Sequence, residues 1–178
     1  MTTQRHDFDP TPFTLEELPH SPRFVLRVRP AHRAALAGVL GLDLPTTIGH
    51  RATRSATEVL CLGPDEWTIL VPDADRAALV AAGVGAYAQT PHSLVEVSDR
   101  EITLRLSGPH ALTALTAGCP RDIDAMAVGQ GVRTLFDSAT VTLWRDERQD
   151  FRMDVWRSFL PHVRALLDKV SAELKSGL

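Results

Sequence analysis

The chain has 178 residues and a formal net charge of −3 at pH 7, without the basic block that nucleic-acid binding demands. Its apolar fraction, 44%, is that of an ordinary globular protein, and no apolar run approaches the ~20 residues needed to cross a bilayer. The polar N-terminal stretch lacks a signal-peptide pattern, and Cys61 and Cys119 lie outside any C-x-x-C pair. We therefore expect a cytoplasmic protein with buried thiols, without nucleic-acid or membrane partners.

The first half of the chain reads as an extended arm followed by an α+β unit. Residues 1–22 contain four prolines, which disfavour helix, and are predicted to form the arm. In Phe24 to Val28, apolar and polar residues alternate as in a strand with one buried face. The predicted elements are a strand at 24–28, a helix from Pro30 to about Leu40, an irregular link at 43–57, strands at 59–62 and 67–71, a helix from Asp73 to about Gly83, and a short strand at 94–97.

The second half repeats this order of elements. The predicted elements are a strand at 102–107, a helix from Pro109 to Gly118, an irregular link at 119–130, strands at 132–136, 139–144 and 151–155, and a last helix that begins near Ser158 as an N-cap. The last helix carries one apolar stripe at spacings of three and four residues, which indicates that it packs on a sheet through one face.

The two halves also match residue by residue around their first helices. Four pairs stand at one constant offset: Pro30 with Pro109, Leu36 with Leu115, Asp43 with Asp122, and Leu44 with Ile123. Proline suits a first helical turn, because the N–H that it lacks has no helical partner there. We therefore predict one α+β domain over 23–178 with two pseudo-repeats, about 23–98 and 99–178. Each is a β-α-β-β-α unit, and the pair forms a two-layer, pseudo-twofold arrangement with an antiparallel sheet.

No cluster of catalytic type is present in the sequence. The seven histidines do not pair at metal-ligand spacings, and His32 and His110 occupy equivalent positions at helix starts on the surface. Asp122 and Asp124 lie in a loop without evident burial, where turn formation explains them better than acid–base chemistry. Ser107-Gly108-Pro109 at a strand-to-helix turn is a weak candidate for anion binding. We predict no catalytic, cofactor-binding or metal-binding residue in this chain.

Two tryptophans fall on the polar side of their strands. Trp144 is out of phase with Val141 and Leu143, and Trp156 shares its side with Arg152 and Asp154, whereas Trp67 is in phase with a buried face. Exposed tryptophan and arginine are typical of protein interfaces, although twisted strand ends could instead tuck both rings under neighbouring segments. The predicted partner interface consists of Trp144, Trp156, Arg27, Arg29 and Arg105.

A set of short motifs, in order, resembles a known family. The motifs are Gly63-Pro64-Asp65-Glu66-Trp67, Val97-Ser98-Asp99-Arg100, Leu106-Ser107-Gly108-Pro109, Gly118-Cys119-Pro120 with Asp122-Ile123, Gly131 to Leu135, and Val155-Trp156-Arg157-Ser158-Phe159. Over about residues 20–175 the chain resembles the gamma subunit of heterotetrameric sarcosine oxidase, whose fold is similar to the folate-binding aminomethyltransferases.

The resemblance implies a non-catalytic, structural subunit. The holoenzyme of that family demethylates sarcosine oxidatively to glycine, passes the one-carbon unit to tetrahydrofolate and forms hydrogen peroxide. NAD, FAD, FMN and zinc are expected in the alpha, beta and delta partner subunits, and no catalytic residue carries over to this chain. The alternative is a free-standing folate-binding protein, with Glu96 or Asp99 as the acidic contact, or an assembly or regulatory protein of one-carbon metabolism.

Overall fold

Two antiparallel sheets of five strands each organise the chain, which this computed structural model describes over residues 12–176. The first sheet has the strand order β3-β4-β5-β2-β6, and the second has the order β1-β7-β10-β9-β8. The elements are β1 (Thr14–Glu17), β2 (Arg23–Val28), α1 (Pro30–Leu40), β3 (Arg51–Arg54), β4 (Thr57–Gly63), β5 (Glu66–Leu70), α2 (Asp73–Ala86), β6 (His92–Glu96), β7 (Glu101–Ser107), α3 (Ala111–Thr116), β8 (Gly131–Phe136), β9 (Ala139–Glu147), β10 (Asp150–Trp156) and α4 (Leu160–Lys175).

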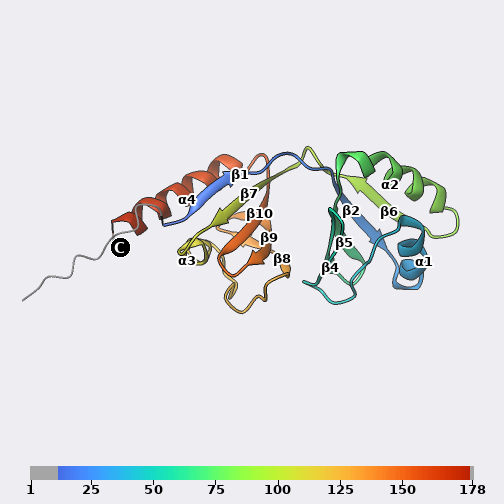
Figure 1. Cartoon of the computed structure of the whole chain (residues 1–178), viewed down its shortest axis with the longest axis horizontal. Helices are drawn as coiled ribbons and strands as arrows, with labels where there is room; N and C mark the ends of the chain where they lie inside the picture. Colours follow the sequence, from blue (N-terminus) through green and yellow to red (C-terminus); the bar gives the residue numbers. More distant parts are fainter. Residues whose placement is uncertain (1–11, 177–178) are drawn as a thin grey trace, which may run out of the picture.

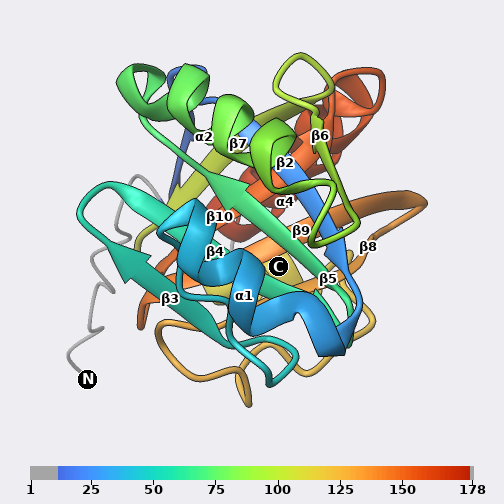
Figure 2. The ribbon, with the colours of Figure 1, turned by 90° about the vertical axis from the view of Figure 1, so that its right-hand side faces the viewer.

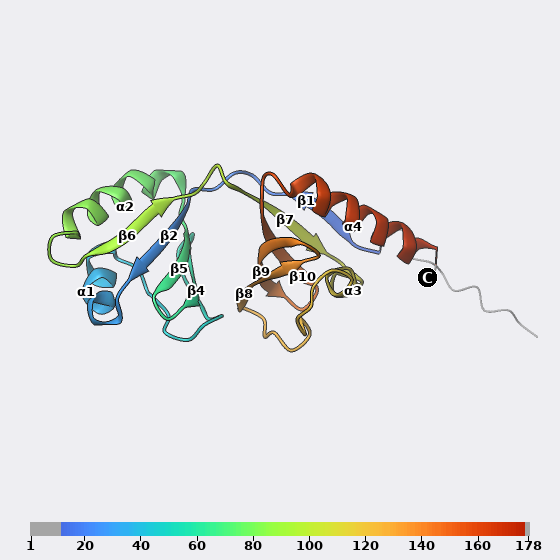
Figure 3. The same ribbon diagram turned by 180° about the vertical axis from the view of Figure 1, so that it is seen from behind.

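The two sheets face each other and carry their helices on the outside. α1 and α2 lie over the outer face of the first sheet, and α3 and α4 lie over that of the second (Figures 1 and 3). Viewed from the α1 and α2 side, the two helices lie in front of β2, β4 and β5 (Figure 2). The α+β class and the antiparallel pairing agree with the sequence, but the predicted two-layer sandwich was wrong. There are four layers, because the polar sides of the strands pack against one another instead of facing solvent.

Both sheets are connected in the same order. In the first, β2 is followed by α1, the meander β3-β4-β5 and α2, and β6 then pairs with the free side of β2. In the second, β7 is followed by α3, the meander β8-β9-β10 and α4. β1, which comes before all other strands in the sequence, pairs with β7 at the position that corresponds to that of β6 beside β2. Residues 14–17 of the predicted arm are therefore an edge strand, while residues 1–11 lie outside the described residues.

Strand alternation builds two separate helix-side cores, one for each sheet. In the first core, Phe24, Leu26 and Trp67 are buried under α1 and α2. The indole Nε1 of Trp67 donates to the carbonyl of Pro45 at 2.8 Å, so its one polar atom is satisfied. Cys61 is buried in this core and Cys119 in the other, and both are free thiols, as predicted.

Some element boundaries differ from those predicted. β3 lies inside the link at 43–57, which was expected to be irregular. The strand was missed because its four residues are too few and too polar to show an apolar alternation. α4 begins at Leu160 after Phe159, without a side-chain cap, so Ser158 is not its N-cap. Pro30 is the first residue of α1, whereas Pro109 lies in the turn before α3, which starts at Ala111.

In the second core, the aromatic ring of Phe136 packs directly against Gly118. Phe136, the last residue of β8, is fully buried, and its ring lies against Gly118 just after α3. A Cβ added at Gly118 would lie 2.8 Å from that ring, closer than packed carbon atoms approach.

Replacing Gly118 with alanine should therefore destabilise the fold. We expect Gly118→Ala to lower the free energy of unfolding by about 1–3 kcal/mol, the usual range for overpacking a core. The control is Gly85→Ala in α2, where an added Cβ meets nothing within 4 Å and a helical alanine is favoured. Urea unfolding of both variants checks this, and an equal effect at the two positions would contradict it.

Candidate functional site: the interface between the two sheets

The facing sides of the two sheets carry most of the buried charge of the described chain. On β10, Phe151, Met153 and Val155 point into the helix-side core, so the residues between them, Arg152 and Asp154, face the other sheet. The same alternation on β2 turns Arg23 toward the second sheet. We call this contact the sheet interface; its members contact one another across the two halves of the chain.

Asp154 is the centre of the first cluster in the sheet interface. Its carboxylate accepts hydrogen bonds from Arg23 Nη2 at 2.8 Å, Thr103 Oγ1 at 2.6 Å and the indole Nε1 of Trp144 at 2.6 Å. Arg23 also donates to Glu101 at 3.0 Å. The side chains of Arg23 and Asp154 are only 3% and 2% exposed, so this ion pair is almost fully removed from water. A buried charge is tolerated where it is paired and hydrogen-bonded; the Asp154 carboxylate meets this condition, whereas Arg23 Nε has no hydrogen-bond partner among the described residues.

Arg152 is the centre of the second cluster. Its guanidinium donates to Asp146 of the same sheet and to Glu58 of the other sheet at 2.7 Å, and it lies 5.1 Å from the centre of the Trp144 ring. Arg51, on β3, reaches Asp146 from the first sheet. Burial alone would lower the pKa of Arg152, but its hydrogen bonds and charge pairs with Asp146 and Glu58 raise that pKa above its ordinary value. Arg152 therefore holds its charge as a cross-sheet link.

An apolar contact and the backbone complete the sheet interface. Leu60 and Leu70 of the first sheet pack on the ring of Trp144 of the second. Beside them, a Cβ on Gly131 would lie 2.7 Å from a methyl of Leu60, so the strands approach closely here. The amide of Gly131 donates to the carbonyl of Gly49 at 3.0 Å, a direct backbone bond between the halves.

Toward its rim the sheet interface opens into a cleft of about 290 Å³. Glu66 in this cleft accepts from Arg133 across the halves and from Arg27 at 2.7 Å. The hydrogen bond from Arg133, opposed by burial, holds the pKa of Glu66 below its ordinary value. The cleft also exposes Trp156, whose ring lies 5.3 Å from the guanidinium of Arg100.

The structure separates the residues of the predicted partner interface. Trp144 was wrongly expected to contact a partner: its ring is fully buried within the chain, because the polar side of its strand faces the other sheet and not solvent. Trp156 is 42% exposed, and Arg27, Arg29 and Arg105 are exposed. Arg27 pairs with Glu66 and Arg105 with Asp150. A partner contact at these four remains a prediction.

Of the two acids considered for folate binding, Glu96 is paired within the chain and Asp99 is exposed. Glu96 accepts from Ser98 at 2.7 Å and pairs with Arg76, and the hydrogen bond from Ser98 holds the pKa of Glu96 below its ordinary value. Asp99 is exposed in the turn before β7. Asp122 accepts from the amide of Ala125 at 3.1 Å, which is the turn role predicted for it.

The geometry of the sheet interface is suited to holding the two sheets together. Each buried carboxylate in it faces a guanidinium. Within residues 12–176 no three His, Cys, Asp or Glu side chains gather in a metal-binding arrangement, and none of the helices there combines the length and hydropathy that crossing a bilayer requires. Sequence reasoning missed Arg23 and Asp154 as partners, because a charged residue that alternates with apolar ones is equally typical of a strand side that faces solvent.

The ion pairs of the sheet interface should give the protein a specific acid sensitivity. Burial raises the pKa of Asp146, but hydrogen bonds and charges from Arg152 and Arg51 outweigh it, so the net pKa is below its ordinary value. Such a carboxylate stabilises the fold fully above the unfolded-state pKa, about 3.9, and this contribution is lost as pH falls through the folded-state pKa.

Asp146→Asn should therefore lower the free energy of unfolding at pH 7 and flatten its decline between pH 5 and pH 3. The control is Asp99→Asn, at a fully exposed carboxylate, which should keep the wild-type acid dependence. Urea unfolding across this pH range measures both, and an Asp146→Asn profile parallel to that of the wild type would contradict the assignment.

Comparison with known proteins agrees with this arrangement. Residues 27–173 match the family described as "Sarcosine oxidase, gamma subunit family". The sarcosine oxidase subunit gamma of Corynebacterium sp. (strain U-96) is 34% identical over 89% of this chain and 79% of its own length. The solved heterotetrameric sarcosine oxidase from Corynebacterium sp. U-96, in complex with pyrrole 2-carboxylate, superposes with a TM-score of 0.83 at 32% identity, covering 92% of this chain and 85% of the matched one.

A more distant structure shows the fold alone. Glycine cleavage system aminomethyltransferase T from Bartonella henselae superposes with a TM-score of 0.67 at 11% identity, over 88% of this chain and 45% of that one. The family match runs from the end of β2 into α4, and it leaves out β1 and most of β2, including Arg23. The chain belongs to the sarcosine oxidase gamma subunit family.

Proposed function

We propose that this chain is the non-catalytic gamma subunit of a heterotetrameric sarcosine oxidase. The observation that carries the proposal is the 34% identity to a sarcosine oxidase gamma subunit, extended over both sheets. The chemistry of the sheet interface supports a structural role, because its buried carboxylates and guanidiniums join the two halves. The two halves, with equivalent strand orders, would then be a duplicated unit that forms one rigid body.

Under this assignment, the chemical reaction would take place in the other subunits of the complex. The complex would demethylate sarcosine to glycine, pass the one-carbon unit to tetrahydrofolate and form hydrogen peroxide. NAD, FAD, FMN and zinc would be held by alpha, beta and delta subunits. This chain would contribute a preformed surface against which those subunits pack.

Trp156 and its neighbours form the exposed patch that best fits such a contact. Trp156 and Phe159 pack against each other with their rings tilted by 49° and their centres 6.4 Å apart, and they are 42% and 38% exposed. The Arg100 guanidinium lies over the Trp156 ring. Tryptophan and arginine are enriched in interface hot spots. Side chains that are already held in place also lose little conformational entropy on binding.

Trp156→Ala should weaken assembly while leaving the fold intact. We expect a loss of about 2 kcal/mol, or roughly 30-fold in affinity for the remaining subunits, as is usual for an interface hot spot. Trp156→Phe should recover most of that loss. The measurement is co-purification of the full chain with the remaining subunits, with titration of the variants against them and urea unfolding of each chain alone.

Two outcomes distinguish an error in the proposed contact surface from an error in the subunit assignment. Wild-type affinity in Trp156→Ala would refute this surface. Failure of the wild-type chain to co-purify with any flavin-bearing partner would refute the subunit assignment itself.

A further inference from the structure

The two halves differ at the end of the strand that opens each meander, which is β3 in the first half and β8 in the second. Arg54 pairs with Thr57 at the end of β3, and Phe136 pairs with Ala139 at the end of β8. In both hairpins the next residue has a positive φ, 54° at Ser55 and 52° at Asp137. Arg54 and Phe136 are thus structural counterparts.

In the second half, the hairpin turn closes onto the end of α3. The amide of Asp137 donates to the carbonyl of Gly118 at 2.7 Å. The Phe136 ring, fully buried, then fills the space between the end of α3, the sheet and α4, in one cluster with Leu115, Val163 and Leu167. The helix-side core of this half is complete.

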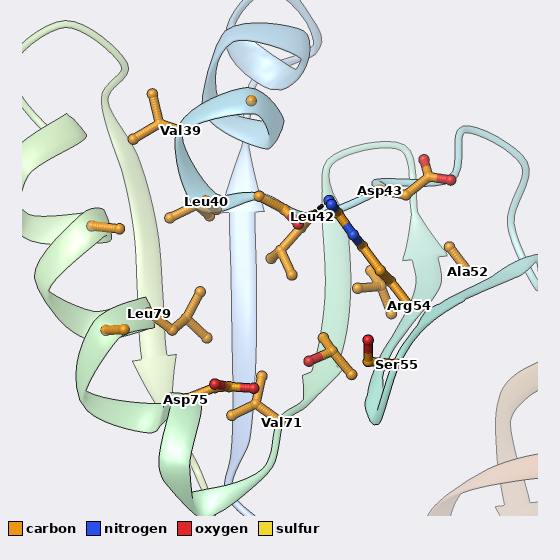
Figure 4. Close-up of a pocket in the computed structure, with 16 residues that line it drawn as sticks. Val39, Leu40, Leu42, Asp43, Ala52, Arg54, Ser55, Val71, Asp75 and Leu79 are labelled. Atoms are coloured by element: carbon orange, nitrogen blue, oxygen red, sulfur yellow. Dashed lines mark hydrogen bonds between the residues drawn. The ribbon is translucent and has the colours of Figure 1, made fainter.

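In the first half, a side chain links the end of β3 to the end of α1. Arg54 Nη1 donates to the carbonyl of Gly41 at the end of α1, at 3.3 Å, and the space below this bridge is open (Figure 4). The opening is a pocket of about 450 Å³ between α1, α2 and the β3–β4 hairpin.

The pocket has an apolar floor and a polar, charged rim. Its floor and walls include Leu40, Leu42, Val59, Val71, Leu79 and the small side chains Ala78 and Ala82. Asp43, Arg54 and Asp75 stand around its mouth. A pocket with apolar side chains at its floor and polar groups at its mouth has room for one bulky side chain or a small ligand.

We propose that this pocket receives an aromatic side chain of a partner subunit, which completes the first core as Phe136 completes the second. The proposal rests on the subunit assignment made above. The occupant is inferred from the second half of the chain. There, the position that corresponds to Arg54 is Phe136, and its phenyl ring fills the corresponding space. A buried aromatic ring removes about 150–250 Å² of apolar surface from water, enough to make such a contact an anchor of assembly.

The test fills the pocket from within the chain. Arg54→Phe places the chain's own ring where the second half has one, and Ala82→Phe fills the same space from α2. Both full-length variants should keep or raise the thermal midpoint of the isolated chain and should bind the remaining subunits at least tenfold more weakly than the wild type. Arg54→Gln removes the charge without filling the pocket and should stay within threefold of the wild type. Arg148→Phe, on the exposed β9–β10 turn, is the matched control and should do the same.

Each other outcome overturns the proposal. Wild-type affinity in Arg54→Phe and Ala82→Phe would show that no partner side chain enters, while the subunit assignment stands. Equal losses in Arg54→Gln and Arg54→Phe would assign the effect to the guanidinium alone. A small molecule retained by the purified chain and lost in Ala82→Phe, seen by native mass spectrometry, would make the pocket a ligand site. A wild-type chain that binds no other subunit would remove the subunit assignment and this proposal together.

Discussion

The carboxylate of Asp154 is buried between two sheets, where a charge without partners would cost several kcal/mol. Its principal partner, Arg23, is 131 residues away in the sequence and belongs to the other half. With the sheets packed, loss of either member of this pair would leave the other as a buried charge without its partner. The two halves therefore depend on each other, and the relative placement of the sheets is set by a few geometrically demanding hydrogen bonds together with apolar packing around Trp144.

This constraint decides which surfaces remain for other proteins. The polar strand faces, which in an open antiparallel sheet would meet solvent, are used within the chain. What stays accessible is the rim of the sheet interface, the outer helices and the open pocket under Arg54. The halves differ here: one core is closed by its own Phe136, and the other keeps an open pocket spanned by the hydrogen bond from Arg54 to Gly41.

Much of the fold could be predicted from the sequence, since period-two alternation and helix-start prolines depend only on local geometry. The strands around Phe24 and Met153 and the buried Trp67 follow from it. The phase of Trp144 was also interpreted correctly, but its environment was not, because alternation tells which residues share a side of a strand and not what covers that side. β3 was missed because its pairing with β4, and not its own composition, holds it extended. The Arg23–Asp154 pair depends on how two distant sheets pack, and local sequence carries no record of that distance.

The central claim is that the sheet interface holds the halves together through its buried ion pairs, and a double-mutant cycle between Arg23 and Asp154 tests it most directly. Arg23→Met, Asp154→Asn and the double variant should give a coupling free energy of about 2 kcal/mol or more in urea unfolding, toward the upper end of values for contacting residues. The reference cycle is Arg27 with Asp65, an exposed pair 3.7 Å apart, which should couple by less than about 1 kcal/mol. A coupling at Arg23 and Asp154 no larger than that of the exposed pair would contradict the account.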